Sequence, residues 1–496
     1  MYLPLGTYSP DLTLGLVSAS RNCFPRALSA ARTERLLQAA ADAGLKLVVP
    51  RGDCAIIESK AHAAEAAAQL KAAEVDAVVL YLGNFSPEIE DAVFLKEFGG
   101  YALLLAAAEE SRASLSAGRG DALCGLLSAV LGIKKRGLLG RVHLPETPVV
   151  DTAAAVAEIA HFRRVMRVVK GARRATLGLF GPRPRDFETC NYNIAALASI
   201  GMEVEELGLF DLQNEVAQVR AAGGAAALAA QMQTAVPGVP ADGGFTARLA
   251  DYEQALLNLR ERFKLSGAAT QCWSEMEWKL GHVPCFINGR LADRGFPVAC
   301  ENDCYSLAAE LLCQYASDDA VTVLDINHSV PRELCAGLRE VPAEDLVGMF
   351  HCGNTAARRL KNPAMKYQLI MKRLMEPDGA PGITRGTVEG QILAAPITVA
   401  QVHGDGDQLR AYIAEGQFLD LDPATFGCTG TAHLPGFRRF YRHVLLGNYH
   451  HHAAVAFGHC GAVLFDAFKL LGVKQTDTPR PAGLPYPGEN VFRAKL

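Results

Sequence analysis

The sequence predicts an α/β protein in which two Rossmann-like domains with parallel sheets precede a mainly antiparallel β domain. Short apolar runs alternate with helical stretches from Leu12 to Leu105, and a similar alternation follows His161. From residue 386 the pattern changes to a period of two, with β-branched residues and Gly-Asp turns. A chain of 496 residues also exceeds the size that one hydrophobic core supports. We therefore expect domains at residues 1–155, 156–345 and 346–496.

The first domain is expected to alternate strands and helices, which is the pattern of a parallel sheet flanked by helices. Its expected strands are the apolar runs at 12–20, 45–50, 76–83 and 101–106. Its expected helices cover residues 27–43 and 61–73, and another begins at Asp121.

The second domain is expected to open with a basic helix from His161 that leads into a strand at 175–180. The turn that follows, Gly181 to Pro184, lacks the glycine spacing of phosphate-binding loops, so we interpret it as structural. Further elements are expected as a strand at 202–208 and helices at 221–230 and 251–263.

The third domain begins with a segment rich in Lys and Arg, 358–373, which we interpret as the solvated face of a helix. Residues 386–422 then predict antiparallel strands that form a small barrel or a sandwich.

Composition narrows the class of partner. Half of the residues are apolar and the formal net charge is only -4, so the chain has no electrostatic footprint for nucleic acid or an anionic membrane.

No uncharged apolar run reaches the ~18 residues of a membrane helix, and the N-terminus lacks the basic start of a signal peptide. Thirteen cysteines without a CxxC pair indicate reduced, mostly buried thiols. We expect a cytoplasmic protein with a small, neutral ligand.

Two carboxylates stand at the ends of predicted elements. Glu301 heads a helical pattern, and Asp325 follows the apolar run 321–324, which reads as a buried strand. Ligands of open α/β sheets bind beyond the carboxyl ends of the strands. Residues 447–461 supply four histidines, and carboxylates with imidazole are suited to a divalent cation. By themselves, both acids could equally be ordinary helix-cap and strand-end residues.

Five segments resemble the L-fucose isomerase and L-arabinose isomerase superfamily, most closely its fucose isomerase branch. They are Ala122–Ser128, Val298–Leu312, Leu324–Asn327, Phe350–Asn354 and His451–Ala462. The resemblance implies a ketol isomerase that binds a divalent cation, usually manganese, through Glu301, Asp325 and His452. It leaves His450 and His451 as neighbours of the site or surface residues, and His459 as a residue that orients the site.

Two carboxylates with one imidazole and no thiolate suit Mn²⁺ or Mg²⁺, and Co²⁺ remains an alternative. We expect isomerisation of an aldose to a ketose through a cis-ene-diol, with Glu301 and Asp325 as catalytic acid and base in an order that the sequence leaves open. The alternatives are a sugar-binding homologue without turnover and a metal-enolate epimerase or aldolase. L-Fucose, D-arabinose and a hexose modified at C6 all remain candidate substrates.

Several residues are expected to contact the sugar. His351 is either such a contact or a fourth metal ligand. Arg21, in this family, would act from a neighbouring subunit, so we expect a homo-oligomer, either a trimer or a hexamer. The other expected contacts, polar or aromatic side chains near the motifs, are Gln271, Trp273, Asn302, Asn327 and Tyr449.

Overall fold

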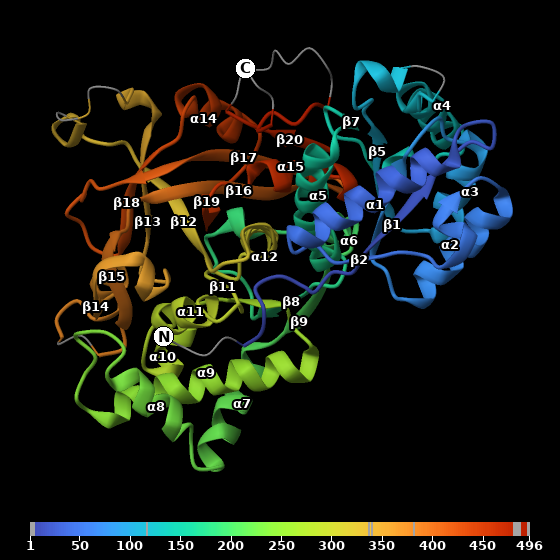
Figure 1. Ribbon diagram of the computed structural model, residues 1–496. Helices are drawn as coiled ribbons and strands as arrows, with labels where there is room; N and C mark the ends of the chain where they lie inside the picture. Colours follow the sequence, from blue (N-terminus) through green and yellow to red (C-terminus); the bar gives the residue numbers. More distant parts are fainter. Residues whose placement is uncertain are drawn as a thin grey trace.

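The computed structural model describes residues 5–115, 118–335, 338, 341–379, 382–479 and 488–493. The described chain forms two parallel sheets, each covered by helices, and a larger, mainly antiparallel sheet. In Figure 1 the N-terminal unit lies on the right, the second sheet and its helices lie below, and the C-terminal strands lie at the upper left. The expected fold class is confirmed.

The N-terminal sheet has the strand order β2-β1-β4-β5-β6, and β3 and β7 pair with β1 and β5. Helices cover both of its faces, which explains why β1 and β4 are buried along their whole length. Its strands are β1 (Leu14–Ala19), β2 (Leu47–Val48), β3 (Ile56–Ile57), β4 (Ala77–Leu82), β5 (Tyr101–Ala107), β6 (Val142–His143) and β7 (Val149–Val150). Its helices are α1 (Arg26–Asp42), α2 (Lys60–Ala72), α3 (Glu88–Phe98), α4 (Ala122–Lys135) and α5 (Thr152–Ala172).

The second sheet is also parallel, with the order β11-β10-β8-β9. Its strands are β8 (Thr176–Phe180), β9 (Glu203–Leu207), β10 (Gly267–Thr270) and β11 (Val298–Ala299). The helices of this part of the chain are α6 (Ile194–Ala198), α7 (Leu209–Ala221), α8 (Ala226–Gln233), α9 (Gly243–Phe263), α10 (Glu275–Leu280), α11 (Cys285–Ala292) and α12 (Cys304–Ser317).

The third sheet has the order β14-β15-β18-β13-β12-β19-β16-β17-β20, and an additional pairing of β17 with β18 closes six of its strands into a barrel. The strands are β12 (Val321–His328), β13 (Leu346–His351), β14 (Leu360–Tyr367), β15 (Arg385–Ile392), β16 (Ala395–Asp405), β17 (Gln408–Leu419), β18 (Cys428–His433), β19 (His452–Phe457) and β20 (Gln475–Asp477). The accompanying helices are α13 (Leu369–Met375), α14 (Phe437–Leu446) and α15 (Gly461–Leu471).

Helix α12 lies at the centre of the molecule and connects these layers. It packs against α5 and against β16 and β19 of the barrel, and every residue from Cys304 to Ala316 is buried. Small residues on β19, Ala454 and Ala456, are fully buried in the same hydrophobic cluster as α12. α12 is therefore enclosed on all sides, unlike a surface helix with one apolar stripe, and it also buries the polar side chains of Ser306, Glu310 and Gln314.

Three expectations about local structure were wrong. The run 321–324 does not belong to a parallel sheet, because β12 pairs antiparallel with β13 and β19 and continues to His328. The basic segment 358–373 is half strand β14 and ends in the short helix α13, and Arg358 pairs with Asp293 and Asp319 instead of projecting from a solvated helix. The expected helix at 221–230 is divided between α7 and α8 by the glycines at 223 and 224.

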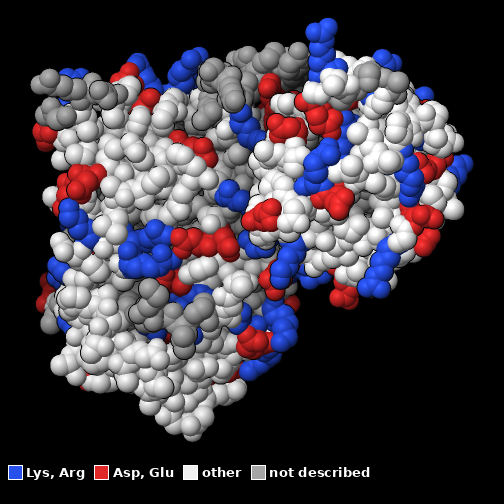
Figure 2. Space-filling model, viewed as in Figure 1, with Lys and Arg blue, Asp and Glu red and all other residues white. Residues whose placement is uncertain are grey.

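The surface and the thiols agree with the composition. On the face shown in Figure 2, basic and acidic side chains are interspersed. Among the described residues, none of the helices combines the length and the apolar character that a membrane crossing requires. All thirteen cysteines are free thiols, and Cys300 and Cys304 are both buried.

Candidate metal and active site

Glu301 lies in the tight connection between β11 and α12, at the carboxyl edge of the second sheet. Glu301 and Asn302 both have left-handed backbones, with φ of 55° and 54°. This conformation is uncommon for residues other than glycine and is often found at functional sites. Trp273 follows β10 at the same edge, and its Nε1–H donates to Oε1 of Glu301 over 3.1 Å. The second oxygen, Oε2, is thereby directed away from the indole.

His452 is the first residue of β19, and Asp303 fixes its ring. The Nδ1 atom lies 2.7 Å from Oδ2 of Asp303, which also accepts from the Ser306 hydroxyl over 2.6 Å. Asp303 is the N-cap of α12 as well, since its Oδ1 accepts from the Ser306 backbone N–H over 3.0 Å. A carboxylate that accepts from Nδ1 leaves Nε2 as the nitrogen available to a metal.

Asp325 is brought beside His452 by strand register, because the two residues are paired partners on β12 and β19. The His452 Nε2 atom lies 2.9 Å from Glu301 Oε2 and 3.5 Å from Asp325 Oδ1. Adjacent ligands of a six-coordinate ion with bonds of about 2.1 Å are about 3 Å apart. None of these three buried atoms has a hydrogen-bond partner in the described structure. Among the described residues, His452 shares one group of ligand atoms within 4.8 Å of one another with Glu301 and His351, and a second such group with Asp325 and His451. Glu301 and Asp325 share no such group. The donor types around His452 Nε2, carboxylate and imidazole, fit a divalent metal ion.

Charge interactions govern the protonation of this centre. Burial raises the pKa of Glu301, but the nearby charge of His452 reverses this effect and lowers that pKa to about 2. Burial lowers the pKa of His452, yet Glu301 and Asp303 raise it well above its usual value. The pKa of Asp303 is held below its usual value by His450 and His452 despite burial. Two carboxylates thus stabilise positive charge at one buried position.

His351, the last residue of β13, is buried beside the same centre. One ligand atom each of Glu301, His351 and His452 lies within 4.8 Å of the other two. The Nδ1 atom of His351 accepts from the Cys352 backbone N–H over 2.9 Å. A neutral imidazole that accepts at Nδ1 carries its proton on Nε2, so in this arrangement Nε2 is a donor rather than a metal ligand.

His450 and His451 are neighbours of the centre, as the sequence indicated. One ligand atom each of Asp325, His451 and His452 lies within 4.8 Å of the others, and burial lowers the pKa of His450 to about 4. His459 does not orient the site: its ring is exposed, and Nε2 lies 3.0 Å from the carbonyl oxygen of Gly416. Its expected role was wrong, because Asp303 performs it.

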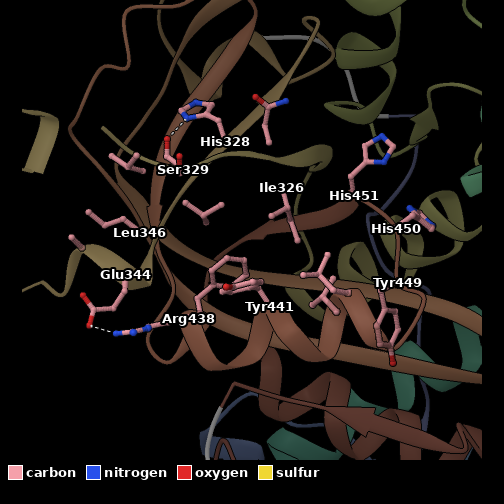
Figure 3. A pocket seen from close by; sticks show the side chains of 17 residues that line it. Ile326, His328, Ser329, Glu344, Leu346, Arg438, Tyr441, Tyr449, His450 and His451 are labelled. Atoms are coloured by element: carbon pink, nitrogen blue, oxygen red, sulfur yellow. Dashed lines mark hydrogen bonds and ion pairs between the residues drawn. The ribbon is translucent and has the colours of Figure 1, made fainter. Parts of the chain in front are cut away.

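A cavity of about 610 Å³ borders the centre on the side of His451. Figure 3 shows Tyr449, His450 and His451 along one side of the cavity and Glu344 and Leu346 on the other. Two of the expected sugar contacts, Asn327 and Tyr449, line this cavity. Asn327 is exposed, whereas the buried Tyr449 donates its hydroxyl to Asp477 over 3.3 Å.

The remaining expected contacts differ in position. Gln271 is buried two residues before Trp273, and its Oε1 has no partner in the described structure. Asn302 faces a different cavity, and its side chain donates to the carbonyl of Gly181. The recorded side-chain contacts of Arg21 all lie within its own N-terminal unit, with Phe85, Ser86 and Glu88. Within one chain, the structure does not bring Asn302 or Arg21 to the three ligand atoms.

Sequence reasoning gave no specific role to Asp303 or Cys190. The Asp303-x-x-Ser306 spacing before a helical pattern is an N-cap signal, and this signal was sufficient to mark Asp303 as a buried, fixed carboxylate. Cys190 lies with Asp303 and His452 in a group whose ligand atoms are within 4.8 Å of one another. Burial raises the pKa of this thiol to about 11, against the effect of a hydrogen bond with His452. No local pattern in the sequence distinguishes Cys190 from the other cysteines.

Comparison with known families now adds to this geometry. A model described as the N-terminal domain of fucose/sulfoquinovose isomerase matches residues 15–173, and one described as the C-terminal domain of L-fucose isomerase matches residues 349–477. The second range contains His351 and His452, while Glu301 and Asp325 lie between the two ranges. The comparison with curated proteins gave no significant match.

The two matches indicate a sugar isomerase by class. The chain belongs to the fucose isomerase-like superfamily.

Proposed function

We propose that the protein is a divalent-metal-dependent aldose–ketose isomerase that acts on a monosaccharide. The observation that carries the proposal is that His452 Nε2 lies 2.9 Å from Glu301 Oε2 and 3.5 Å from Asp325 Oδ1, all three being buried atoms without hydrogen-bond partners in the described structure. Membership of a sugar isomerase superfamily supports the same activity. A protein that only bound a sugar would have no need of two carboxylates around one imidazole.

Glu301, Asp325 and His452 would hold the ion, and Mn²⁺ is the expected occupant, with Mg²⁺ and Co²⁺ as alternatives. When bound, the ion would chelate two sugar oxygens and stabilise the negative charge of a cis-ene-diol. The protein orients the proposed ligands through hydrogen bonds: the Trp273 indole N–H donates to Glu301, and Asp303 holds the Nδ1 side of the His452 ring.

The proton between C1 and C2 would be moved by Glu301 or Asp325. Their environments differ: the Glu301 side chain is 10 % exposed and held by the indole, whereas that of Asp325 is 19 % exposed. Two carboxyl groups in unlike environments are what an acid–base pair requires. His351, as a donor at Nε2, would hold a sugar oxygen and so orient the substrate between the two carboxylates.

The test is a screen of aldoses with and without Mn²⁺, with products identified by NMR. The panel contains L-fucose, D-arabinose and hexoses modified at C6, including the sulfoquinovose named by the matched family. Turnover in D₂O should place deuterium at C1 of the ketose, because a proton held by a carboxylate exchanges with water. Ketose formed without deuterium at C1 would indicate a hydride shift and would remove Glu301 and Asp325 from the role of base.

Two other outcomes would replace the proposal. Saturable sugar binding without a product would indicate a binding protein that has lost turnover. Inversion at one carbon, or cleavage of a carbon–carbon bond, would indicate an epimerase or an aldolase that uses the same stabilisation of negative charge.

The proposed assembly is a cytoplasmic homo-oligomer, a trimer or a hexamer, in which Arg21 of one subunit reaches the centre of another. In support, the recorded contacts of Arg21 within its own chain involve only the N-terminal unit. Light scattering with activity measured on the same sample tests this arrangement. A stable monomer with full activity would contradict it.

A further inference from the structure

A second cluster of histidine and carboxylate side chains lies where the N-terminal unit meets the C-terminal unit. His143 is the last residue of β6, His161 lies on α5, and Asp466 lies on α15. One ligand atom from each residue lies within 4.8 Å of the other two. None of these residues belongs to the candidate active site, and the mechanism proposed above does not use them.

The contacts within the cluster leave one imidazole nitrogen unsatisfied. His161 Nε2 lies 2.8 Å from Asp466 Oδ2. The ring of His143 stacks on Phe162 and lies 5.9 Å from the ring of His161, centroid to centroid. His143 is only 5 % exposed, and its buried Nε2 atom has no hydrogen-bond partner in the described structure. A buried nitrogen of this kind is normally satisfied by a water molecule or an ion.

The protonation states favour a metal ligand set. Burial lowers the pKa of His143 to about 4, so this imidazole is neutral at pH 7 and presents a lone pair. Burial raises the pKa of Asp466, but the hydrogen bond from His161 reverses this effect and the carboxylate is ionised. The charge of Lys469 on α15 also lowers the pKa of His143, and that of Glu158 on α5 raises it. Glu158 is itself paired with Arg493.

We propose that His143, His161 and Asp466 form a structural site for Zn²⁺ that joins the N-terminal unit to the C-terminal unit. Two imidazoles and one carboxylate are a donor set that zinc accepts, with water as the fourth ligand. We assign the site to joining the two units and not to binding substrate because its ligands are enclosed: the exposed fractions of the Asp466 and His161 side chains are 1 % and 14 %. The ion would connect β6 and α5, which are close in the sequence, to α15, which lies about 300 residues further along the chain.

The experiment separates this site from the candidate active site by removing the ligands of the latter. Protein carrying Glu301→Gln and His452→Ala is stripped with a chelator and titrated with Zn²⁺ by calorimetry, and bound zinc is counted after gel filtration. We expect one zinc per chain and a melting temperature that rises with zinc. Addition of His161→Asn or Asp466→Asn should weaken binding at least tenfold and abolish the rise.

Two controls keep the test decisive. His459→Asn, a change of the same type at an exposed histidine, should leave zinc binding unchanged. Circular dichroism identifies a variant that fails to fold, and His161→Asn is the conservative choice because its side chain is the most exposed of the three. Co²⁺ in the same background should give visible d–d bands that His161→Asn removes. Absence of zinc from the Glu301→Gln, His452→Ala protein, or equal binding after His161→Asn, would overturn the proposal.

Discussion

Two aspartate–histidine pairs in this molecule have nearly the same geometry and very different surroundings. Asp303 lies 2.7 Å from His452 and Asp466 lies 2.8 Å from His161, measured between oxygen and nitrogen. The far nitrogen of His452 faces two more carboxylates, near a cavity of about 610 Å³ that His451 lines. The neighbour of the second pair is another imidazole, that of His143, within a closed junction.

The difference shows that the pair alone does not define a function. The surrounding charge and the access to solvent define it. Two additional carboxylates attract a cation, and a nearby cavity can admit a substrate. An enclosed second imidazole can only add a further ligand. Six substitutions, grouped in four predictions, test this comparison.

The largest effect is expected from the ligands of the candidate active site. Glu301→Gln and His452→Ala should each reduce bound Mn²⁺ from about one equivalent to nearly none, and activity by at least about 10³-fold, because each removes a metal ligand with little loss of packing. Metal analysis of the purified variants measures this directly, with circular dichroism to confirm the fold. Undiminished metal in both variants would remove these residues from the ligand set.

The second-largest effect is expected at Asp303, with Asp466 as the matched control. Asp303→Asn should weaken Mn²⁺ binding about 10- to 100-fold, since an amide no longer fixes the His452 ring as a carboxylate does. Asparagine is also a good N-cap, so α12 should persist. The matched change Asp466→Asn should leave Mn²⁺ affinity and turnover at 25 °C unaltered. Equal losses in the two variants would show that the clusters are not independent.

A third buried carboxylate, Glu277 on α10, has no imidazole partner and serves as the reference case. Neither of its oxygens has a partner in the described structure, and burial, with a contribution from Glu376, raises its pKa to about 9. The folded state therefore retains a proton that the unfolded chain loses near pH 4.5. Stability should fall as the pH rises from about 4.5 to about 9, because over this range the folded state binds more protons than the unfolded state.

Glu277→Gln should remove this decline, which amounts to about 1–3 kcal/mol after allowance for relaxation of the site. Urea unfolding of both proteins at pH 5, 7 and 9 gives the comparison. Parallel pH profiles for the variant and the natural protein would show that Glu277 is already ionised in the fold.

The smallest effect is expected at Trp273. Trp273→Phe keeps an aromatic ring but deletes the Nε1–H that donates to Glu301, and a bond to a charged acceptor contributes about 1.5 kcal/mol. We expect kcat/KM to fall about tenfold with metal content unchanged. Steady-state kinetics at saturating Mn²⁺ measure this value, and a loss of metal would instead assign Trp273 to the support of the ligand.

The sequence predicted those parts of the molecule that depend on local pattern. Short, continuous apolar runs predicted the strands β1, β4, β5 and β8, because strands buried on both faces of a sheet are continuously apolar. The change to a period of two after residue 386 indicated the antiparallel barrel. The segments that resemble the superfamily predicted Glu301, Asp325 and His452 as metal ligands. The structure places one oxygen of Glu301 2.9 Å and one oxygen of Asp325 3.5 Å from His452 Nε2, and the ligand set stays a prediction.

Long-range features were not predictable in the same way. The sheet to which β12 belongs depends on its pairing with β13 and β19, residues that follow it at some distance. The run of basic residues in 358–373 resembled a helix face by composition, but Asp293 and Asp319 supply the partners that hold Arg358. The meeting of His143 with Asp466 likewise requires the complete arrangement of the N-terminal and C-terminal units.

The position of β19 has a consequence for when the proposed metal site can form. β19 lies between β12 and β16 in the barrel, although both strands precede it in the sequence. During folding, the ring stays open until β19 inserts, and pairings this distant form slowly because loop closure opposes them. Since this strand carries His452, an incomplete chain offers only carboxylates, which hold transition ions weakly. If the proposed metal site is correct, its complete ligand set therefore forms only once β19 has paired with β12 and β16.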